Sequence, residues 1–144
     1  MFEIYTDGAC KGNPGKGGWG FVIYNKAEKI LEKSGSCEYT TNNKMELIAV
    51  IEAIEAFINM YNNNEKMILY TDSAYVWNGI CKWINTWKKN NWMTCNKNPV
   101  KNQDLWQKLD ILLDPTRFEF KWVKAHNGNI GNEYADKLAN MSII

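Results

Sequence analysis

Four short segments, far apart in the chain, each carry an acidic residue among small or polar neighbours. They are Tyr5-Thr6-Asp7-Gly8, Asn42-Asn43-Lys44-Met45-Glu46, Tyr70-Thr71-Asp72-Ser73 and Asn132-Glu133-Tyr134-Ala135-Asp136. Carboxylates gathered from distant segments repel one another, so folding would not assemble them for stability. A hard divalent cation such as Mg²⁺ prefers oxygen ligands and offsets this repulsion. The sequence therefore predicts a fold that brings Asp7, Glu46, Asp72 and Asp136 into one metal site.

The pattern of apolar residues predicts an α/β protein. We expect strands over residues 2–6, 19–24, 29–38, 66–71 and 118–124, and helices over residues 43–61, 101–113 and 132–141. The glycine-rich segment 8–18 is typical of a loop, and shorter helices are expected between Ser73 and Asn102. Strands followed by helices in this order favour a mixed sheet flanked by helices. Asp72, where a strand leads into a helix, would then lie at a ligand-binding edge of the sheet.

Composition sets broad limits on the class of protein. A chain of 144 residues with 45% hydrophobic content fits one domain over residues 1–144, and we expect a monomer. The four cysteines have no C-x-x-C spacing, which favours a reduced, cytoplasmic setting. No apolar run is long enough to span a bilayer, so no membrane association is expected.

Each acid also has a structural interpretation that needs no metal. Asp7 before a glycine is a turn former, Asp72 before a helix is an N-cap, and Glu46 completes a capping box begun by Asn43. Asp136, on a short helix, is typical of a solvated helical carboxylate. The helical face of Glu46 argues for burial, because it is otherwise apolar. The residues on that face are Ala49, Val50, Ala53 and Phe57.

The net charge is only +1, so any surface for a polyanion must come from local asymmetry. The chain has no acidic residue from Ser73 to Gln103. Residues 80–101, hereafter the basic protrusion, combine lysines with tryptophans, which suits nucleic-acid binding. The alternative is that Trp83 and Trp87, four residues apart, anchor a helix whose lysines are merely solvated. The protrusion contains Lys82, Lys88, Lys89, Lys97 and Lys101 beside Trp83, Trp87 and Trp92.

The four acidic motifs recur in the order found in a known family, and the last includes the segment Lys-Ala-His-Asn-Gly-Asn-Ile-Gly-Asn-Glu-Tyr-Ala-Asp that ends at Asp136. From about Phe2 to about Asn140 the chain resembles bacterial-type ribonuclease H. The resemblance implies a five-stranded mixed sheet with helices on both faces. It also implies a metal-dependent endonuclease that cleaves the RNA strand of RNA–DNA hybrids, leaving 5′-phosphate and 3′-hydroxyl ends.

Carried over by position, the resemblance makes Asp7, Glu46, Asp72 and Asp136 the metal-binding acids and His126 a catalytic histidine. Two Mg²⁺ ions, with Mn²⁺ as a substitute, would serve the in-line displacement. We expect Asp7 to bridge them, because its strand is central in this fold. The glycines and asparagines around His126 predict a mobile loop, and a histidine titrating near neutral pH can move protons.

The resemblance also supplies substrate-binding residues. Near the acids they are Gly8, Cys10, Asn13, Asn42 and Asn43, whose small or amide groups suit the 2′-hydroxyls of a shallow minor groove. In and just after the basic protrusion they are Trp83, Lys88, Lys89, Trp92 and Asn102, which would hold the DNA strand. Ordinary turn chemistry is the alternative for the first group. Ala74 stands where the family commonly has a polar side chain, so one contact is expected to be missing.

Two other classes of protein compete with this interpretation. A nuclease or transposase on the same scaffold would use similar acids on DNA. The histidine loop and the asparagines beside Glu46 disfavour it. A non-catalytic hybrid-binding module would keep the basic protrusion and lose one or more acids, whereas all four acids are present.

Overall fold

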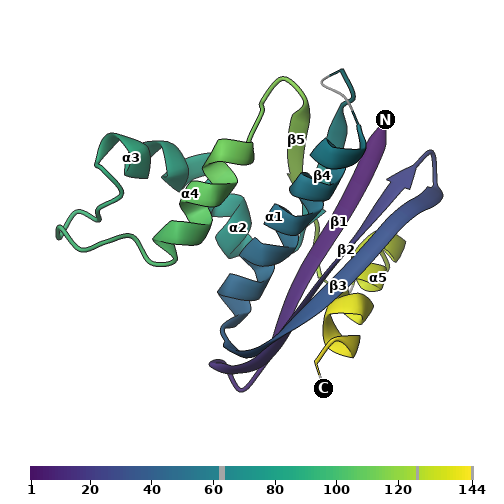
Figure 1. Cartoon of the computed structure of the whole chain (residues 1–144), viewed down its shortest axis with the longest axis horizontal. Helices are drawn as coiled ribbons and strands as arrows, with labels where there is room; N and C mark the ends of the chain where they lie inside the picture. Colours follow the sequence, from purple (N-terminus) through teal and green to yellow (C-terminus); the bar gives the residue numbers. More distant parts are fainter. Residues whose placement is uncertain (62–63, 126, 144) are drawn as a thin grey trace.

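Five strands form one mixed sheet in the order β3-β2-β1-β4-β5 (Figure 1). The computed structural model describes residues 1–61, 64–125 and 127–143. The central strand β1 runs antiparallel to β2 and parallel to β4, and β4 runs parallel to β5. The strands are β1 (Phe2–Lys11), β2 (Gly15–Asn25), β3 (Glu28–Thr40), β4 (Met67–Thr71) and β5 (Phe118–Trp122).

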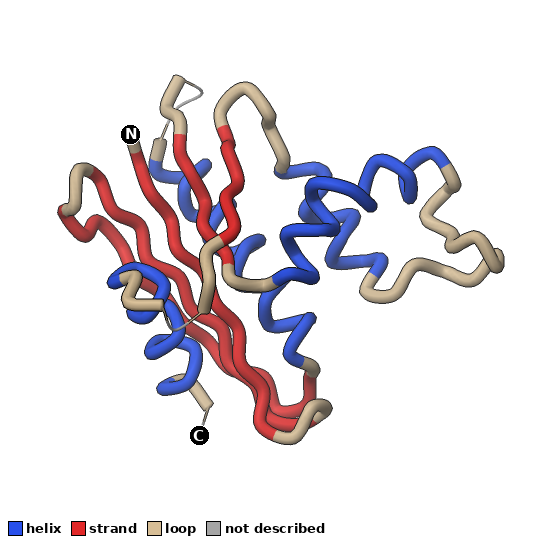
Figure 2. The backbone as a smooth tube through the Cα atoms, turned by 180° about the vertical axis from the view of Figure 1, so that it is seen from behind, coloured by secondary structure: helices blue, strands red, loops and turns tan. Residues whose placement is uncertain are grey.

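Helices cover both faces of this sheet, which confirms the predicted fold class (Figures 1 and 2). Helix α1 packs on β1 and β2 with α4 beside it, and α5 packs on the other face of β1 and β2. The main core lies under α1, where Phe57, Leu69 and Trp106 are fully buried. The helices are α1 (Asn42–Met60), α2 (Ala74–Asn78), the π-helix η1 (Gly79–Trp83), α3 (Ile84–Lys89), α4 (Gln103–Leu112) and α5 (Ile130–Met141).

Strand β1 divides its side chains between these two layers, because successive side chains of a strand point to opposite faces. Phe2 contacts the ring of Phe57 in α1, with ring centroids 5.3 Å apart. Tyr5 lies on the opposite face, against Gly131 of α5. The same alternation places the side chain of Asp7 on the face covered by α5, close to the point where α1 packs on the other face.

The predicted loop over residues 8–18 was wrong. Most of this segment is strand, since β1 and β2 pair as far as Lys11 and Lys16. Only residues 12–14 form the turn, where Gly12 has a φ of 70° that favours glycine. Local composition indicated a loop, but pairing between the two strands and close packing of helices on small residues decided the outcome. The other predicted elements are present, with ends that differ by a few residues.

The segment between Ser73 and Asn102, which includes the basic protrusion, contains the short helices that we expected. Helices α2, η1 and α3 follow one another without a break, and the segment after α3 extends away from the sheet (Figure 1). The π-helix places Gly79 so close to Trp106 that an added Cβ would lie 2.0 Å from the ring. None of the helices in the described part of the chain is long and apolar enough to cross a membrane.

Candidate active site

The site forms where β1 extends beyond the end of its neighbour β4. The last paired residues of the two strands are Thr6 and Thr71. Asp7 is therefore the first residue of β1 without a β4 partner, and Asp72 directly follows β4. Because parallel strands end at the same edge, these two acids lie side by side at the carboxyl end of β4.

Helix α1 supplies the third acid through a close approach to β1. The helix begins after Thr41, whose Oγ1 accepts a hydrogen bond from the N–H of Lys44. Its second turn rests on Gly8, where an added Cβ would lie 2.4 Å from the backbone nitrogen of Glu46. Only a glycine allows this approach. As a result Glu46, which is 6% exposed, lies beside Asp7.

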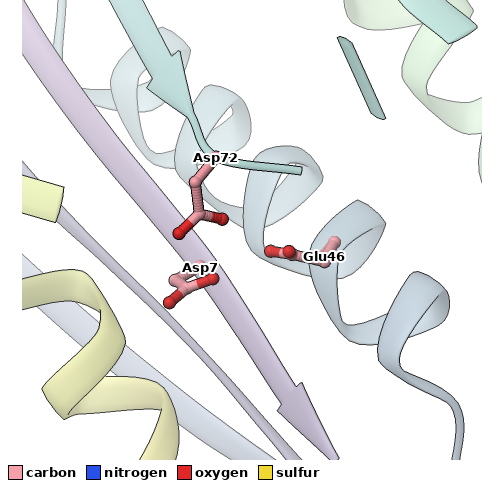
Figure 3. A group of neighbouring side chains, drawn as sticks. All are labelled: Asp7, Glu46 and Asp72. Carbon is pink, nitrogen blue, oxygen red and sulfur yellow. The ribbon is translucent and has the colours of Figure 1, made fainter. Parts of the chain in front are cut away.

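The three carboxylates converge on one small volume (Figure 3). One oxygen each from Asp7, Glu46 and Asp72 lies within 4.8 Å of the others. Asp7 is 4% exposed and Asp72 is half-buried. The site therefore combines three oxygen donors with restricted access to water.

Burial raises the pKa of Asp7, and the charges of Glu46 and Asp72 raise it further. Hydrogen bonds with Asp136 and Glu46 act in the same direction. Burial and the charge of Asp72 also raise the pKa of Glu46, against smaller opposing effects from hydrogen bonds with Asp7 and the Gly8 N–H. Each acid thus raises the free energy of ionising its neighbours.

Asp136 lies in α5, on the face of the sheet opposite α1, which is the face to which Asp7 points. Asp136 is among the groups that raise the pKa of Asp7, so its carboxyl group lies near that side chain. It also accepts a hydrogen bond from Nδ2 of Asn140 over 3.1 Å. The structure therefore brings three of the four predicted acids into one group, with Asp136 close to Asp7 but outside the group of oxygens within 4.8 Å.

The metal-free interpretations of Asp7, Asp72 and Glu46 do not hold. Asp7 lies within β1, so it does not form a turn. Ser73, not Asp72, caps α2 by accepting a hydrogen bond from the N–H of Val76. Thr41, not Asn43, caps α1, so Glu46 lies beyond the first turn and completes no capping box.

A divalent cation fits this donor set. The ligand atoms are carboxylate oxygens, which suit Mg²⁺ and Mn²⁺. The charges that raise the pKa of Asp7 are themselves negative, so the cluster is under electrostatic repulsion that a cation would relieve. Asp7, Glu46, Asp72 and Asp136 are the residues that would hold it.

The predicted substrate residues near the acids lie between the β1–β2 turn and the start of α1, where Gly8 is buried under α1 and the others reach the surface. Asn13 Oδ1 accepts a hydrogen bond from the N–H of Asn42 over 3.0 Å. Asn42 and Asn43 are half-buried in the first turn of α1. The thiol of Cys10 points back to the carbonyl oxygens of Gly15 and Thr40, 3.6 and 3.4 Å away.

The predicted substrate residues of the basic protrusion surround an aromatic cluster. The Trp87 ring packs on Trp83, Trp92 and Trp106, which confirms its packing role. Trp83 itself is 36% exposed. The packing interpretation therefore holds for Trp87, and the binding role of Trp83 stays a prediction.

The polar residues of this region differ in how far they are engaged. Lys88 Nζ lies 3.3 Å from Asp110 Oδ1 of α4. Lys89 is exposed at the end of α3. Asn102 donates a hydrogen bond through Nδ2 to the hydroxyl of Tyr75 over 3.1 Å. Lys89 therefore presents its charge more openly to a polyanion than Lys88 does.

Two residues mark the limits of the sequence analysis. His126 lies outside the described residues, so its predicted role stays a prediction. Asn132 was quoted only as part of a motif, yet its Nδ2 donates a hydrogen bond to Asp72 Oδ2 over 3.1 Å. The signal for this contact was its spacing of four residues from Asp136, which puts both on one helical face.

The fold and the acids define an α/β protein with a carboxylate cluster that could hold a divalent metal ion. The family model RNase H matches residues 1–144. The chain is 51% identical to the ribonuclease H of Nitrosospira multiformis, over 99% of this chain and 89% of that one. It is 50% identical to the ribonuclease H of Dichelobacter nodosus, over 99% and 92%. The chain therefore belongs to the ribonuclease H family, as the resemblance implied.

Solved structures agree with this assignment. LC11-RNase H1, solved in complex with an RNA/DNA hybrid, has a TM-score of 0.77 and 25% identity, covering 99% of this chain and 96% of that chain. LC9-RNase H1, described as a type 1 RNase H with the type 2 active-site motif, has a TM-score of 0.84 and 29% identity, covering 99% and 71%.

Proposed function

We propose that this protein hydrolyses the RNA strand of RNA–DNA hybrids at the cluster of Asp7, Glu46, Asp72 and Asp136. The proposal depends on one observation above all: oxygens of Asp7, Glu46 and Asp72 lie within 4.8 Å of one another in a chain of the ribonuclease H family. The complex of the similar LC11-RNase H1 with an RNA/DNA hybrid supports the choice of substrate.

The chemistry needs a metal, and the acids have distinct parts in holding it. Two bound Mg²⁺ ions, or Mn²⁺ in their place, would activate a water and stabilise the leaving 3′ oxygen, giving 5′-phosphate and 3′-hydroxyl ends. Asp7, on the central strand between the other acids, is the candidate bridging ligand. Glu46 and Asp72 complete one side of the site and Asp136 the other. His126 is assigned to proton movement near the phosphate.

Selectivity for a hybrid is assigned to two surfaces. The polar surface of Gly8, Cys10, Asn13, Asn42 and Asn43 adjoins the acids and offers amides and small groups to minor-groove 2′-hydroxyls. The basic protrusion offers rings and charge to the phosphates and sugars of the DNA strand. Its residues in this role are Trp83, Lys88, Lys89, Trp92 and, just after it, Asn102.

We assign the protein to the cytoplasm as a monomer, with residues 1–144 forming one domain. The four cysteines Cys10, Cys37, Cys81 and Cys95 are all free thiols, which suits a reducing compartment. The sheet and its helices share one main core, which suits a single domain.

The direct test is cleavage of end-labelled duplexes. Hybrid, duplex DNA and duplex RNA are incubated with Mg²⁺, with Mn²⁺ or with EDTA, and Asp7→Asn serves as the inactive control. We expect cleavage of the hybrid's RNA strand only, with either metal and not with EDTA. Cleavage of duplex DNA would favour another nuclease on this scaffold. Tight binding of the hybrid without cleavage would favour a non-catalytic module.

A further inference from the structure

The structure assigns to Asn132 the task of holding the carboxylate of Asp72 in its metal-binding orientation. This positioning role depends on the proposed function, in which Asp72 is a metal ligand. Asn132 lies in the first turn of α5, on the face of the sheet opposite α1. Its Nδ2 donates a hydrogen bond to Asp72 Oδ2 over 3.1 Å. The contact therefore joins a helix to a residue that follows a strand 60 positions earlier in the chain.

Burial makes this hydrogen bond more than an incidental contact. Asn132 is 2% exposed, whereas asparagines are mostly exposed in proteins. A buried amide raises the free energy of the fold unless it is hydrogen-bonded, so a buried asparagine facing a carboxylate needs that partner. Because the Asn132 side chain is itself buried, water has less access to its amide than to an exposed side chain, although Asp72 is half-buried.

The chemistry of an amide suits a residue that supports a metal ligand. A lysine or arginine in this place would neutralise Asp72 and oppose the cation. The neutral amide instead occupies one lone pair of Oδ2 and fixes the carboxylate, while the negative charge stays available. Side chains that orient metal ligands in this way commonly tune metal affinity.

The N-terminal turn of α5 is itself held firmly in place. The N–H of Asn132 donates to Oδ1 of Asn129 over 2.9 Å. An added Cβ on Gly131 would lie 2.3 Å from the ring of Tyr5, so the helix rests directly on β1. The Tyr5 ring stacks on Tyr70 of β4 at 4.6 Å. Asn132 is thus fixed relative to both strands that carry the acids.

A second amide on the same helix shows what this arrangement adds. Asn140 also donates to an acid of the cluster, Asp136, through Nδ2 over 3.1 Å. That pair is exposed and joins residues one helical turn apart. Water competes there, and the contact ties no separate element to the site. Asn132, buried and reaching across to β4, is the residue that can set the geometry of a ligand.

The test is a titration of the substrate-free protein with Mg²⁺, monitored through the NMR signal of the Gly8 amide. This N–H donates a hydrogen bond to Asp7 Oδ1 over 2.9 Å. In Asn132→Ala and in the bulkier Asn132→Leu, which both lack the donor, we expect Mg²⁺ affinity to fall about 10–100-fold. Ala139→Gly is the matched control, since Ala139 is fully buried on the same helix and its backbone lies against Gly18 and Gly20 of β2. It should melt at a lower temperature but keep the wild-type Mg²⁺ midpoint.

A second readout separates positioning from catalysis. In Asn132→Ala the rate of hybrid cleavage should recover toward the wild-type value at saturating Mg²⁺, because the ligands remain. Wild-type Mg²⁺ affinity in both Asn132 variants, together with lost binding in Asp72→Asn, would overturn the role of Asn132 and leave the proposed function intact. A folded wild-type protein that binds no Mg²⁺ would overturn both.

Discussion

The acidic cluster and the basic protrusion hold their like charges in opposite environments. In the cluster, Asp7 and Glu46 are buried beside like charges that raise the pKa of each. In the protrusion, Lys82, Lys89 and Lys97 are exposed around a core of packed aromatic rings. One region is assembled against electrostatic repulsion, and the other keeps its like charges apart in water.

This difference determines what a bound ligand contributes to the stability of each region. The cluster is stabilised when a cation binds, because binding removes repulsion that the fold alone must overcome. The protrusion is stabilised by its own packed rings, and a polyanion that binds there releases counterions from the lysines. Stability should therefore respond to metal and pH at the cluster, whereas binding should respond to salt at the protrusion.

The largest expected effect is on the chemistry at the cluster. Asp7→Asn removes the candidate bridging ligand, so cleavage of the hybrid should fall by about 10³-fold or more, beyond the loss typical of residues that only support a ligand. The fold should be kept or stabilised in EDTA, because a buried repulsive group is gone. Steady-state cleavage and thermal unfolding measure the two parts. Wild-type-like turnover would refute the metal assignment.

The next effect is on the aromatic core of the protrusion. Trp106 is fully buried, packs on Tyr75 and Trp87, and donates a hydrogen bond to the Tyr75 hydroxyl over 2.9 Å. Trp106→Ala should lower the free energy of unfolding by about 3 kcal/mol or more. Hybrid affinity should fall while the Mg²⁺ midpoint stays unchanged. Ile111→Ala, 83% exposed on the same helix, should alter neither quantity.

The pH dependence of stability that comes from the cluster should be a smaller effect than the two above. Because the folded-state pKa values of Asp7 and Glu46 are raised, their stabilising contribution is full below about pH 4, the ordinary pKa, and is lost as the pH rises. In EDTA the unfolding free energy of the wild type should fall relative to Asp7→Asn by about 1 kcal/mol per pH unit. This corresponds to about 2–4 °C in melting temperature, and excess Mg²⁺ should reverse it. A pH-independent gap would contradict the repulsion.

The smallest expected effect is on the salt dependence of hybrid binding. Lys89→Ala should flatten the log–log slope of affinity against salt by roughly 0.9 unit, and adding Lys88→Ala should bring the change to about 1–2 units. Lys88 should contribute less, since it already pairs with Asp110. Lys108→Ala is the control, because Lys108 lies on α4 and pairs with Glu55. Equal slopes in all variants would show that the lysines of the protrusion do not contact the hybrid.

The sequence predicted the parts of the site that periodicity and order determine. Glu46 was expected on an apolar helical face, and it is buried there. The five-stranded sheet and the meeting of Asp7, Glu46 and Asp72 also agree with the prediction, and Asp136 lies near Asp7. Such features depend on local pattern and on the order of elements, which a single sequence carries.

The sequence could not predict features that depend on contact between distant segments. Residues 8–18 have the composition of a loop, but pairing of β1 with β2 makes most of them strand. The contact of Asn132 with Asp72 depends on how α5 lies on the sheet. The close approach of Gly79, in the π-helix, to the ring of Trp106 depends on a residue 27 positions later in the chain.

The central claim is that acids from distant segments share a divalent cation. Crystals soaked in Mn²⁺ would test it most directly, through the anomalous signal of the metal. We expect a peak about 2.0–2.3 Å from oxygens of Asp7 and of Glu46 or Asp72, and no such peak in crystals of Asp7→Asn. A Mn²⁺ peak elsewhere on the protein, with the cluster unoccupied at saturating metal, would contradict the account.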